Sequence, residues 1–124
     1  ELSAEVARVW SALPEPERTR AVIVGQNYGE AGAIDYFGRA LGLPRAISPH
    51  NSYWLWGTGD WDGRVAIVIG EIPPEIAKLF GGIEKLGHRS CALCMPYERE
   101  LSIYVARDLK IPVSDLWTRI KRFI

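Results

Sequence analysis

Short apolar runs separated by helical or loop segments constrain the fold of this chain more than any other feature of its sequence. Residues 21–24 and 64–69 have the length of one buried strand, and residues 46–48 are predicted as a further strand between them. A weaker run covers residues 83–90, and residues 101–106 alternate Ser, Tyr and Ala with Leu, Ile and Val. Strands that alternate with helices are typical of a mainly parallel sheet covered on both faces. The sequence therefore predicts an α/β fold, a three-layer sandwich around about five strands.

The helices are predicted from the spacing of their apolar residues and from the residues that end them. Residues 2–13 place Leu, Val and Trp side chains on one helical face, and prolines follow directly. Further helices are expected from about residue 30 to 41, over residues 73–80 and over residues 112–123. An N-terminal and a C-terminal helix thus flank a single α/β domain that spans residues 1–124.

Composition narrows the class of protein. The chain has 124 residues, enough for one domain, and its 48% hydrophobic and 24% charged residues are close to the globular average. A net charge of zero gives no electrostatic argument for a nucleic-acid partner or an anionic membrane surface. The longest apolar runs are far shorter than the roughly 20 residues of a membrane-spanning helix. Because the chain begins at Glu1 without Met, we expect a soluble part cut or processed from a larger protein.

The chain has two cysteines, Cys91 and Cys94, and their spacing leaves four interpretations open. They are free thiols, a short-range disulfide, two ligands of a zinc site, or a thioredoxin-like redox pair. A zinc site needs two more ligands, for which the chain offers only His50 and His88. A redox pair usually lies at a helix N-terminus after a strand, whereas Pro96 follows closely here. We expect neither a bound metal nor a cofactor.

Polar and aromatic side chains gather in two segments, each directly after a predicted strand. Ligands of open α/β sheets bind beyond the carboxyl ends of the strands, and neighbouring parallel strands would bring the two segments together. Aromatic faces beside hydrogen-bonding groups suit a sugar, and they also suit a protein interface. Trp61 offers a further aromatic face. The candidate binding residues are Asn27, Tyr28, Glu30, His50, Asn51, Tyr53, Trp54 and Trp56.

Glu30 and His50 are also the weak candidates for catalysis, because a carboxylate and an imidazole can exchange protons with a substrate. Asp60 and Asp62 lie in the same loop region and could supply a second carboxylate. The same residues suit structural roles, in which Glu30 complements a helix dipole and His50 and Asn51 hold a long loop. The sequence contains no complete phosphate-loop, dinucleotide, nucleophile-elbow or zinc-protease motif, so no confident catalytic residue emerges.

A recognisable pattern runs through these two segments and several later ones. It comprises residues 27–35, 43–44, 46, 50–57, 91–98, 103–107 and 116–117. Over these residues the chain resembles the C-terminal soluble region of bacterial polytopic membrane glycosyltransferases. That family is related to the dolichyl-phosphate-mannose–protein mannosyltransferases and to the aminoarabinose lipid A transferases. The resemblance is close over residues 27–57 and looser over the rest of the chain.

The resemblance implies a parent protein with many transmembrane helices that transfers sugar from a polyprenyl-phosphate donor. It places the catalytic carboxylate in an extracytoplasmic loop near the N-terminus of that parent, and no such motif occurs in residues 1–124. The chain is then expected to be a non-catalytic accessory domain on the periplasmic face of the inner membrane that helps to recognise an acceptor or a glycan. Its partners would be the membrane-embedded remainder of the polypeptide and a glycan, protein or lipid acceptor. This compartment favours a disulfide between Cys91 and Cys94 over free thiols.

Two other functions stay open. One is a structural module whose aromatic loops pack on the membrane part or on a second copy, in which case Trp54 and Trp56 are buried. The other is a small hydrolase that uses Glu30 and His50. Catalysis by this pair requires the two side chains within hydrogen-bond reach of each other, directly or through one water molecule.

Overall fold

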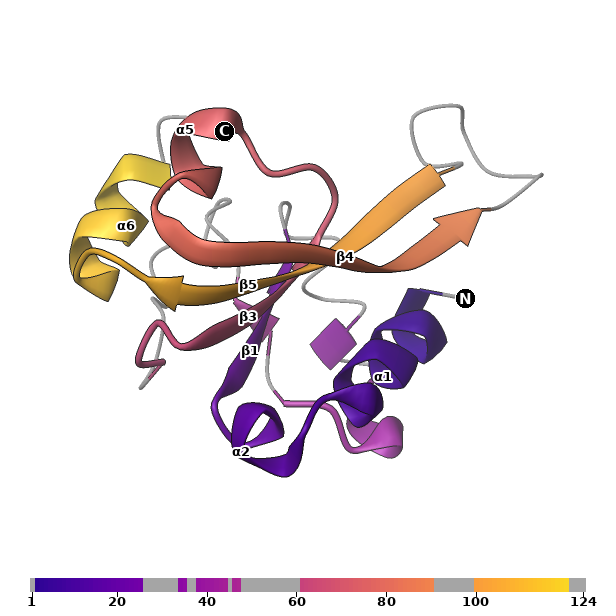
Figure 1. Ribbon diagram of the computed structural model, residues 1–124. Helices are drawn as coiled ribbons and strands as arrows, with labels where there is room; N and C mark the ends of the chain where they lie inside the picture. Colours follow the sequence, from indigo (N-terminus) through magenta and orange to yellow (C-terminus); the bar gives the residue numbers. More distant parts are fainter. Residues whose placement is uncertain are drawn as a thin grey trace.

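The structure is a computed structural model of the chain, and it describes residues 2–25, 34–35, 38–44, 46–47, 61–90 and 100–120 (Figure 1). In chain order the elements are α1 (Leu2–Ala12), α2 (Glu15–Arg18), β1 (Ala21–Gly25), the 3₁₀ helix η1 (Gly38–Leu41), β2 (Ala46–Ile47), β3 (Val65–Ile69), α5 (Pro74–Ala77), β4 (Phe80–Ser90), β5 (Glu100–Leu109) and α6 (Val113–Ile120). The predicted α/β class and the predicted N-terminal and C-terminal helices are confirmed.

Five strands form one mixed sheet in the order β2-β1-β3-β5-β4. β1 is parallel to β2 and β3, whereas β5 is antiparallel to β3 and β4. The expected number of strands is correct, but the expected mainly parallel arrangement is wrong, since only two of the four strand pairs are parallel. Parallel pairing of consecutive strands needs a crossover of about a dozen residues or more, and only residues 91–99 separate β4 from β5. β5 therefore returns as the second arm of a hairpin.

Element boundaries differ from expectation mainly at the short helices. The helix expected over residues 73–80 is only α5, because the chain enters β4 at Phe80, whose side chain belongs to the core. α2 was not expected; it has Pro16 in its first turn, where the missing N–H costs nothing. The helix expected over residues 30–41 is described only in part, and its last turn, η1, is a 3₁₀ helix.

α1 packs on one face of the sheet. Val6 and Val9 of α1, with Leu13 just beyond it, are buried in one cluster with Ile23 of β1 and Ile67 of β3. Alternate residues of a strand point to opposite faces, and this cluster accordingly contains Val65, Ile67 and Ile69 of β3 and Ile103 and Val105 of β5. The hydrophobic spacing recognised in residues 2–13 is therefore the face of α1 that the sheet buries.

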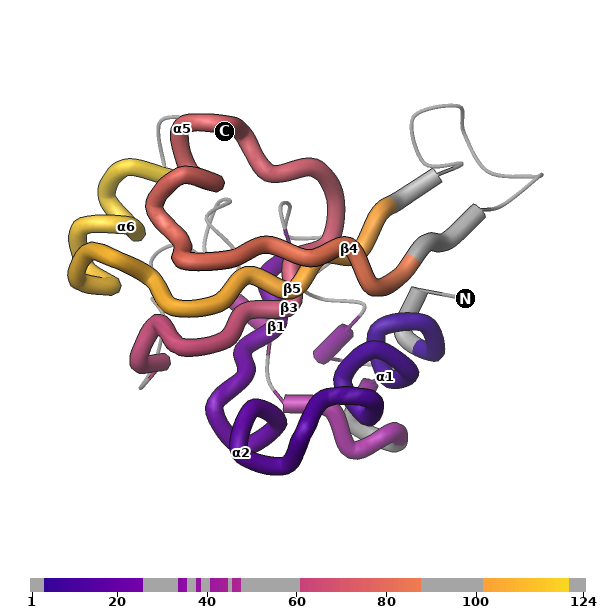
Figure 2. Tube along the Cα trace, in the orientation of Figure 1, coloured from indigo at the N-terminus to yellow at the C-terminus, as the bar shows by residue number. Residues whose placement is uncertain are grey.

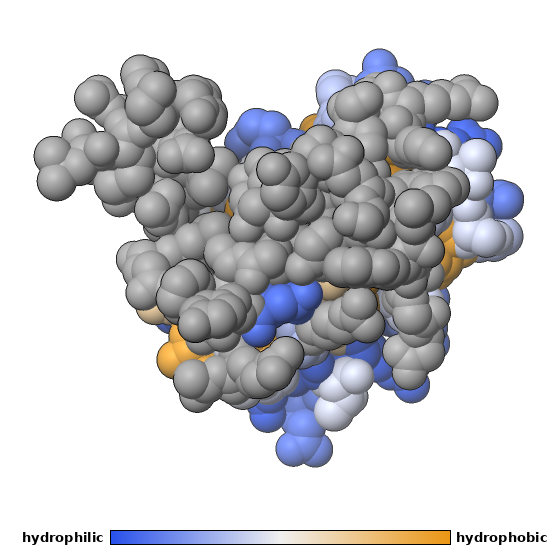
Figure 3. All heavy atoms as spheres, turned by 180° about the vertical axis from the view of Figure 1, so that it is seen from behind, coloured by the Kyte–Doolittle hydropathy of each residue, from blue (hydrophilic) through white to orange (hydrophobic). Residues whose placement is uncertain are grey.

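The opposite face of the sheet packs against α5 and α6, which lie across the sheet from α1 (Figure 1). Ile76 of α5 and Leu116 and Trp117 of α6 are buried in a second cluster with Ala66 and Val68. Because β3 is buried on both faces, its sequence is a continuous apolar run. Seen from behind, the described residues at the surface are mostly hydrophilic, with small separate apolar patches (Figure 3).

α1 also contacts the edge strand β4, and Figure 2 shows the helix beside the β4–β5 hairpin. Arg8 Nη2 donates to the Leu86 carbonyl oxygen at 2.9 Å, while Arg8 Nε pairs with Glu5 Oε1 at 2.8 Å. The register of β4 shifts just before Gly87. A Cβ at Gly87 would lie 2.9 Å from Val9 Cγ2, so the close packing of helix and strand requires glycine here.

Candidate ligand-binding edge of the sheet

The parallel strands β2, β1 and β3 are neighbours and end level with one another. Val24 pairs with Ile47 and Gly25 pairs with Ile69, so the three strands end at the same edge of the sheet. We call this edge, formed by Gly25, Ile47 and Ile69, the carboxyl edge. Ligands of open α/β sheets bind just beyond an edge of this kind. The expectation that the first two strands are parallel neighbours is confirmed.

The segments that continue from β1 and β2 at this edge are residues 26–33 and 48–60. They contain every predicted binding residue, and all of these lie outside the described residues: Asn27, Tyr28, Glu30, His50, Asn51, Tyr53, Trp54 and Trp56. The weak catalytic candidates Glu30 and His50 are among them. Cys91 and Cys94, between β4 and β5, also lie outside the part of the chain that the structure describes. The roles of these residues stay predictions.

A turn after β3 brings a carboxylate to the carboxyl edge. Gly70 has a φ of 93°, a conformation that residues with a side chain rarely adopt. Its N–H donates to the Ser102 carbonyl oxygen of β5 at 2.8 Å. The turn thus closes on β5 directly beyond the last pair of the two strands, Ile69 and Ile103. The next residue, Glu71, is exposed.

Glu71 and Tyr104 form a hydrogen-bonded pair at this turn. Tyr104 lies on β5 opposite Val68, and its hydroxyl is 3.0 Å from each carboxylate oxygen of Glu71. Partial loss of hydration raises the pKa of Tyr104, the hydrogen bond to Glu71 raises it further, and a hydrogen bond with the Ser102 side chain opposes the rise. Tyr104 is therefore protonated at neutral pH and donates to Glu71, while its ring packs against the cluster on the α6 side.

The sequence analysis missed Glu71, Tyr104 and Ser102, although part of the signal was present. Gly70 and Glu71 directly follow the third predicted strand, in the same position as the two segments after β1 and β2. Ser102 and Tyr104 are polar residues that alternate with the apolar residues of a strand. Only the antiparallel register of β5 on β3 brings them to Glu71, and periodicity does not reveal strand direction.

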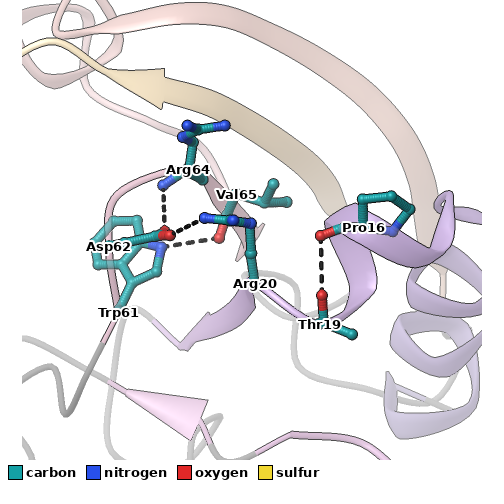
Figure 4. Close-up of polar contacts among 7 residues, drawn as sticks. All are labelled: Pro16, Thr19, Arg20, Trp61, Asp62, Arg64 and Val65. Atoms are coloured by element: carbon teal, nitrogen blue, oxygen red, sulfur yellow. Dashed lines mark hydrogen bonds and ion pairs between the residues drawn. The ribbon is translucent and has the colours of Figure 1, made fainter.

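Trp61 does not belong to a binding surface, and its expected role as a surface aromatic is wrong. Trp61 is 7% exposed and lies in the cluster that packs against α6. Its Nε1–H donates to the Val65 carbonyl oxygen at 3.0 Å, at the beginning of β3 (Figure 4). Burial of the ring and satisfaction of its N–H together make Trp61 an anchor for the amino end of β3.

Asp62 lies before the amino end of β3, at the opposite edge of the sheet. Its Oδ2 accepts from Arg20 Nη1 at 2.7 Å and its Oδ1 accepts from the Arg64 N–H at 3.0 Å (Figure 4). Burial acts to raise the pKa of Asp62, but the hydrogen bonds and charges of Arg64 and Arg20 outweigh it and hold this pKa below its ordinary value. The length of β3, roughly 15 Å, separates Asp62 from the carboxyl edge. It is therefore no second carboxylate for that edge, and Asp60 lies outside the described residues.

Within the described ranges, no group of three or more His, Cys, Asp or Glu side chains is placed to hold a metal ion. In the same part of the chain, no helix is long and apolar enough to cross a membrane.

Comparison of the chain with protein-family models, with curated proteins and with solved structures finds no match. A function must therefore be inferred from the residues of this chain.

Proposed function

We propose that this chain is an accessory domain that binds a glycan or an acceptor at its carboxyl edge and is not itself catalytic. The observation that carries the proposal is the parallel pairing of β1 with β2. Because neighbouring strands lie about 4.8 Å apart, residues 26–33 and residues 48–60 begin side by side. Their polar and aromatic side chains can then contribute to one surface.

The residue types in these two segments match the surface of a sugar. Trp54 and Trp56 supply flat apolar faces for its C–H groups, as aromatic rings do in other amphipathic contacts. Asn27 and Asn51 each offer a donor and an acceptor, and Glu30 offers acceptors only. Hydroxyl groups around the sugar ring need such a mixture of partners, so we assign glycan recognition to this surface.

The parent protein in this proposal is a polytopic glycosyltransferase that uses a polyprenyl-phosphate-linked sugar. This assignment rests on the resemblance of residues 27–57 to the C-terminal region of that family. We propose that the domain lies on the periplasmic face of the inner membrane, joined to the membrane-embedded part of the same polypeptide. Catalysis is assigned to that membrane part, because no family carboxylate motif occurs in residues 1–124.

Titration with a panel of neutral glycans, followed by amide chemical shifts, tests the binding role. We expect the largest shifts in residues 26–33 and 48–60 and in the adjoining strand ends, Gly25 and Ile47. Amides at the opposite edge, such as those of Arg20 and Gly63, should not move. If a broad panel of sugars and acceptor peptides shifts no signal in either segment, the binding role is wrong and a structural module is favoured.

Substitution of the aromatic residues provides a matched test. Trp54→Ala and Trp56→Ala should each weaken glycan binding about tenfold, which corresponds to about 1.4 kcal/mol. Ile83→Ala is the control, because Ile83 is an apolar residue on the edge strand β4 with 36% exposure. Unchanged binding in both tryptophan variants would exclude a stacking surface formed by residues 50–57.

We also propose a disulfide between Cys91 and Cys94, as expected for an oxidising compartment. Both cysteines lie in the segment between β4 and β5, directly beyond the pair of Ser90 with Glu100. Labelling of periplasmically expressed protein with a thiol reagent should modify neither cysteine before reduction and both after it. Labelling before reduction would show that the cysteines are free thiols.

A further inference from the structure

We infer that residues 81–85, at the outer edge of β4, pair with the same residues of a second copy of this chain in a two-fold symmetric dimer. β4 is the last strand in the order β2-β1-β3-β5-β4, so no other described strand pairs with its outer side (Figure 1). An edge strand presents N–H and C=O groups that can pair with a strand of another chain. The inference is independent of the proposed glycan-binding role, which concerns the ends of β1 and β2.

The hydrogen bonds of β5 show which main-chain groups of β4 point outward. The N–H of Gly70, just beyond β3, donates to the Ser102 carbonyl oxygen at 2.8 Å, so Ser102 and every second residue after it bond toward β3. The residues between them, such as Val105, bond toward β4 instead. Val105 pairs with Glu84, whose main chain is therefore used within the sheet. The residues on either side of Glu84 direct their N–H and C=O groups away from β5.

The accessible part of this edge is limited to residues 81–85, all of which are exposed. Beyond them α1 lies against the strand, because Arg8 Nη2 donates to the Leu86 carbonyl oxygen at 2.9 Å and Gly87 is buried. Before them, Phe80 is buried in the core. A second strand can therefore pair with this short segment without displacing any helix.

The middle residue of the segment, Ile83, gives a register that suits a second copy. Two identical antiparallel strands related by a two-fold axis place one residue opposite itself, and here Ile83 would face Ile83. Its apolar side chain is 36% exposed in the single chain. Glu84 and Lys85 would then face Gly82 and Gly81 of the second copy, which have no side chain to oppose a charge. A register centred on Glu84 or Lys85 would place like charges directly opposite each other, which is destabilising.

Charge also favours a second copy as the partner. Gly82 pairs with Arg107 of β5, so Glu84 of the second copy, opposite Gly82, would lie in the same row as Arg107 and on the same face. Arg107 already binds Glu84 of its own chain on this face, from Nη1 to Oε1 at 3.0 Å. Two strand spacings, about 10 Å, separate the backbones, and the glycine between them leaves room for both long side chains. The chain has no net charge, so two copies do not repel each other at long range.

The size of the interface sets its strength. Pairing over residues 81–85 would form about six main-chain hydrogen bonds, two at each hydrogen-bonded pair. So short a segment buries less than the roughly 800 Å² per partner of a standard interface. We therefore expect a dimer that forms and dissociates with protein concentration.

Sedimentation of the chain from about 1 μM to about 1 mM tests the inference. The average mass should rise toward that of a dimer, and the amide signals of Ile83 and Lys85 should shift with concentration. Ile83→Lys places two lysines opposite each other at the axis and should weaken self-association at least about tenfold. Leu41→Lys is the matched control, because Leu41 is an apolar residue of η1 with 48% exposure, and it should self-associate as the wild type does. Equal weakening by both substitutions would overturn the inference.

A mixture of two variants tests the register. Ile83→Asp should self-associate as weakly as Ile83→Lys, whereas a mixture of the two should associate more tightly than either alone, because opposite charges then face each other. Circular dichroism checks that both variants keep the fold. Association of the mixture no tighter than that of the separate variants overturns the inference. A wild type that stays monomeric at every concentration overturns it as well, and leaves this edge to a strand of another protein.

Discussion

At the scale of single residues, Asp62 is an ionised carboxylate held by two arginines, and its stabilising effect depends on pH. Its pKa in the folded protein is lowered from 3.8, so its contribution is complete above the unfolded value and is lost as pH falls through the folded one. Asp62→Asn should therefore lower the free energy of unfolding by about 0.5 kcal/mol at pH 7, as exposed ion pairs do. Urea unfolding at pH 7, 5 and 3 should show that the difference in free energy of unfolding between the wild type and Asp62→Asn shrinks only at pH 3. A difference that is equal at all three would contradict the assignment.

Packing around Gly87 requires a residue that has no side chain. A Cβ there would lie 2.9 Å from Val9 Cγ2 and 3.1 Å from Ile103 Cβ, and both neighbours are buried. Gly87→Ala should therefore destabilise the protein by about 1–3 kcal/mol, as overpacking does. Gly82→Ala on the same strand is the control, because nothing lies within 4 Å of its Cβ. Chemical unfolding should show Gly82→Ala near or slightly above wild-type stability; equal costs for both variants would contradict the packing argument.

At the scale of elements, Arg107 joins α2 and β4 to β5. It makes two bonds to Glu17, from Nε at 2.8 Å and Nη2 at 3.2 Å, and one to Glu84, from Nη1 at 3.0 Å. The Glu17 side chain is 27% exposed and that of Glu84 is 56% exposed. Since bidentate pairs away from solvent are the stronger ones, Glu17→Gln should cost about 1 kcal/mol and Glu84→Gln less than about 0.5 kcal/mol. Urea unfolding of the two variants checks this order of costs. A larger cost for Glu84→Gln than for Glu17→Gln would show that the bond from Arg107 to Glu84 contributes more to stability than the pair with Glu17.

The elements also show which parts of the fold the sequence could reveal. The runs that became β1 and β3 were predicted because both are apolar, and all of β3 and four of the five residues of β1 are buried. The start of β4 was missed because Gly81 and Gly82 carry no strand signal and Phe80 fits a helical pattern equally well. The direction of β5 was missed because alternation of polar and apolar residues is the same for parallel and antiparallel strands.

The same limit applies to the candidate site. The expectation that β1 and β2 are neighbouring parallel strands correctly placed the ends of these two strands side by side. It could not reveal the contact between Glu71 and Tyr104, which are 33 residues apart and meet only through the register of β3 on β5. It also could not show that Trp61 is buried, because burial of a loop residue depends on the elements around it.

At the scale of the whole molecule, the described residues make different polar contacts at the two ends of the parallel strands. The ion pairs of Arg20 with Asp62 and of Arg107 with Glu17 both lie near Val65, where β3 begins. These pairs close the amino edge with groups of the protein itself. The carboxyl edge instead leads into the two aromatic segments and presents Glu71 to solvent. Recognition at one edge is therefore compatible with a rigid structure at the other.

The two core clusters share the residues of one sheet backbone, so they should unfold together. Ile67 is fully buried on the α1 side and Leu116 is 3% exposed on the α6 side. Ile67→Ala and Leu116→Ala should each lower stability by about 2–5 kcal/mol, the usual cost of a large core deletion. Calorimetry should show one transition in both variants, displaced to lower temperature.

Hydrogen exchange distinguishes this cooperative unfolding of the whole domain from local unfolding of a single helix. In Leu116→Ala, the amides of α1 should lose protection by the same free energy as those of α6, although α1 lies on the other face of the sheet. Leu41→Ala is the control, because Leu41 is 48% exposed and its truncation should change stability by less than about 0.5 kcal/mol. If α6 alone lost protection while α1 and β3 kept wild-type values, the α6 layer would be a separate unit, and the sheet would not couple its two faces.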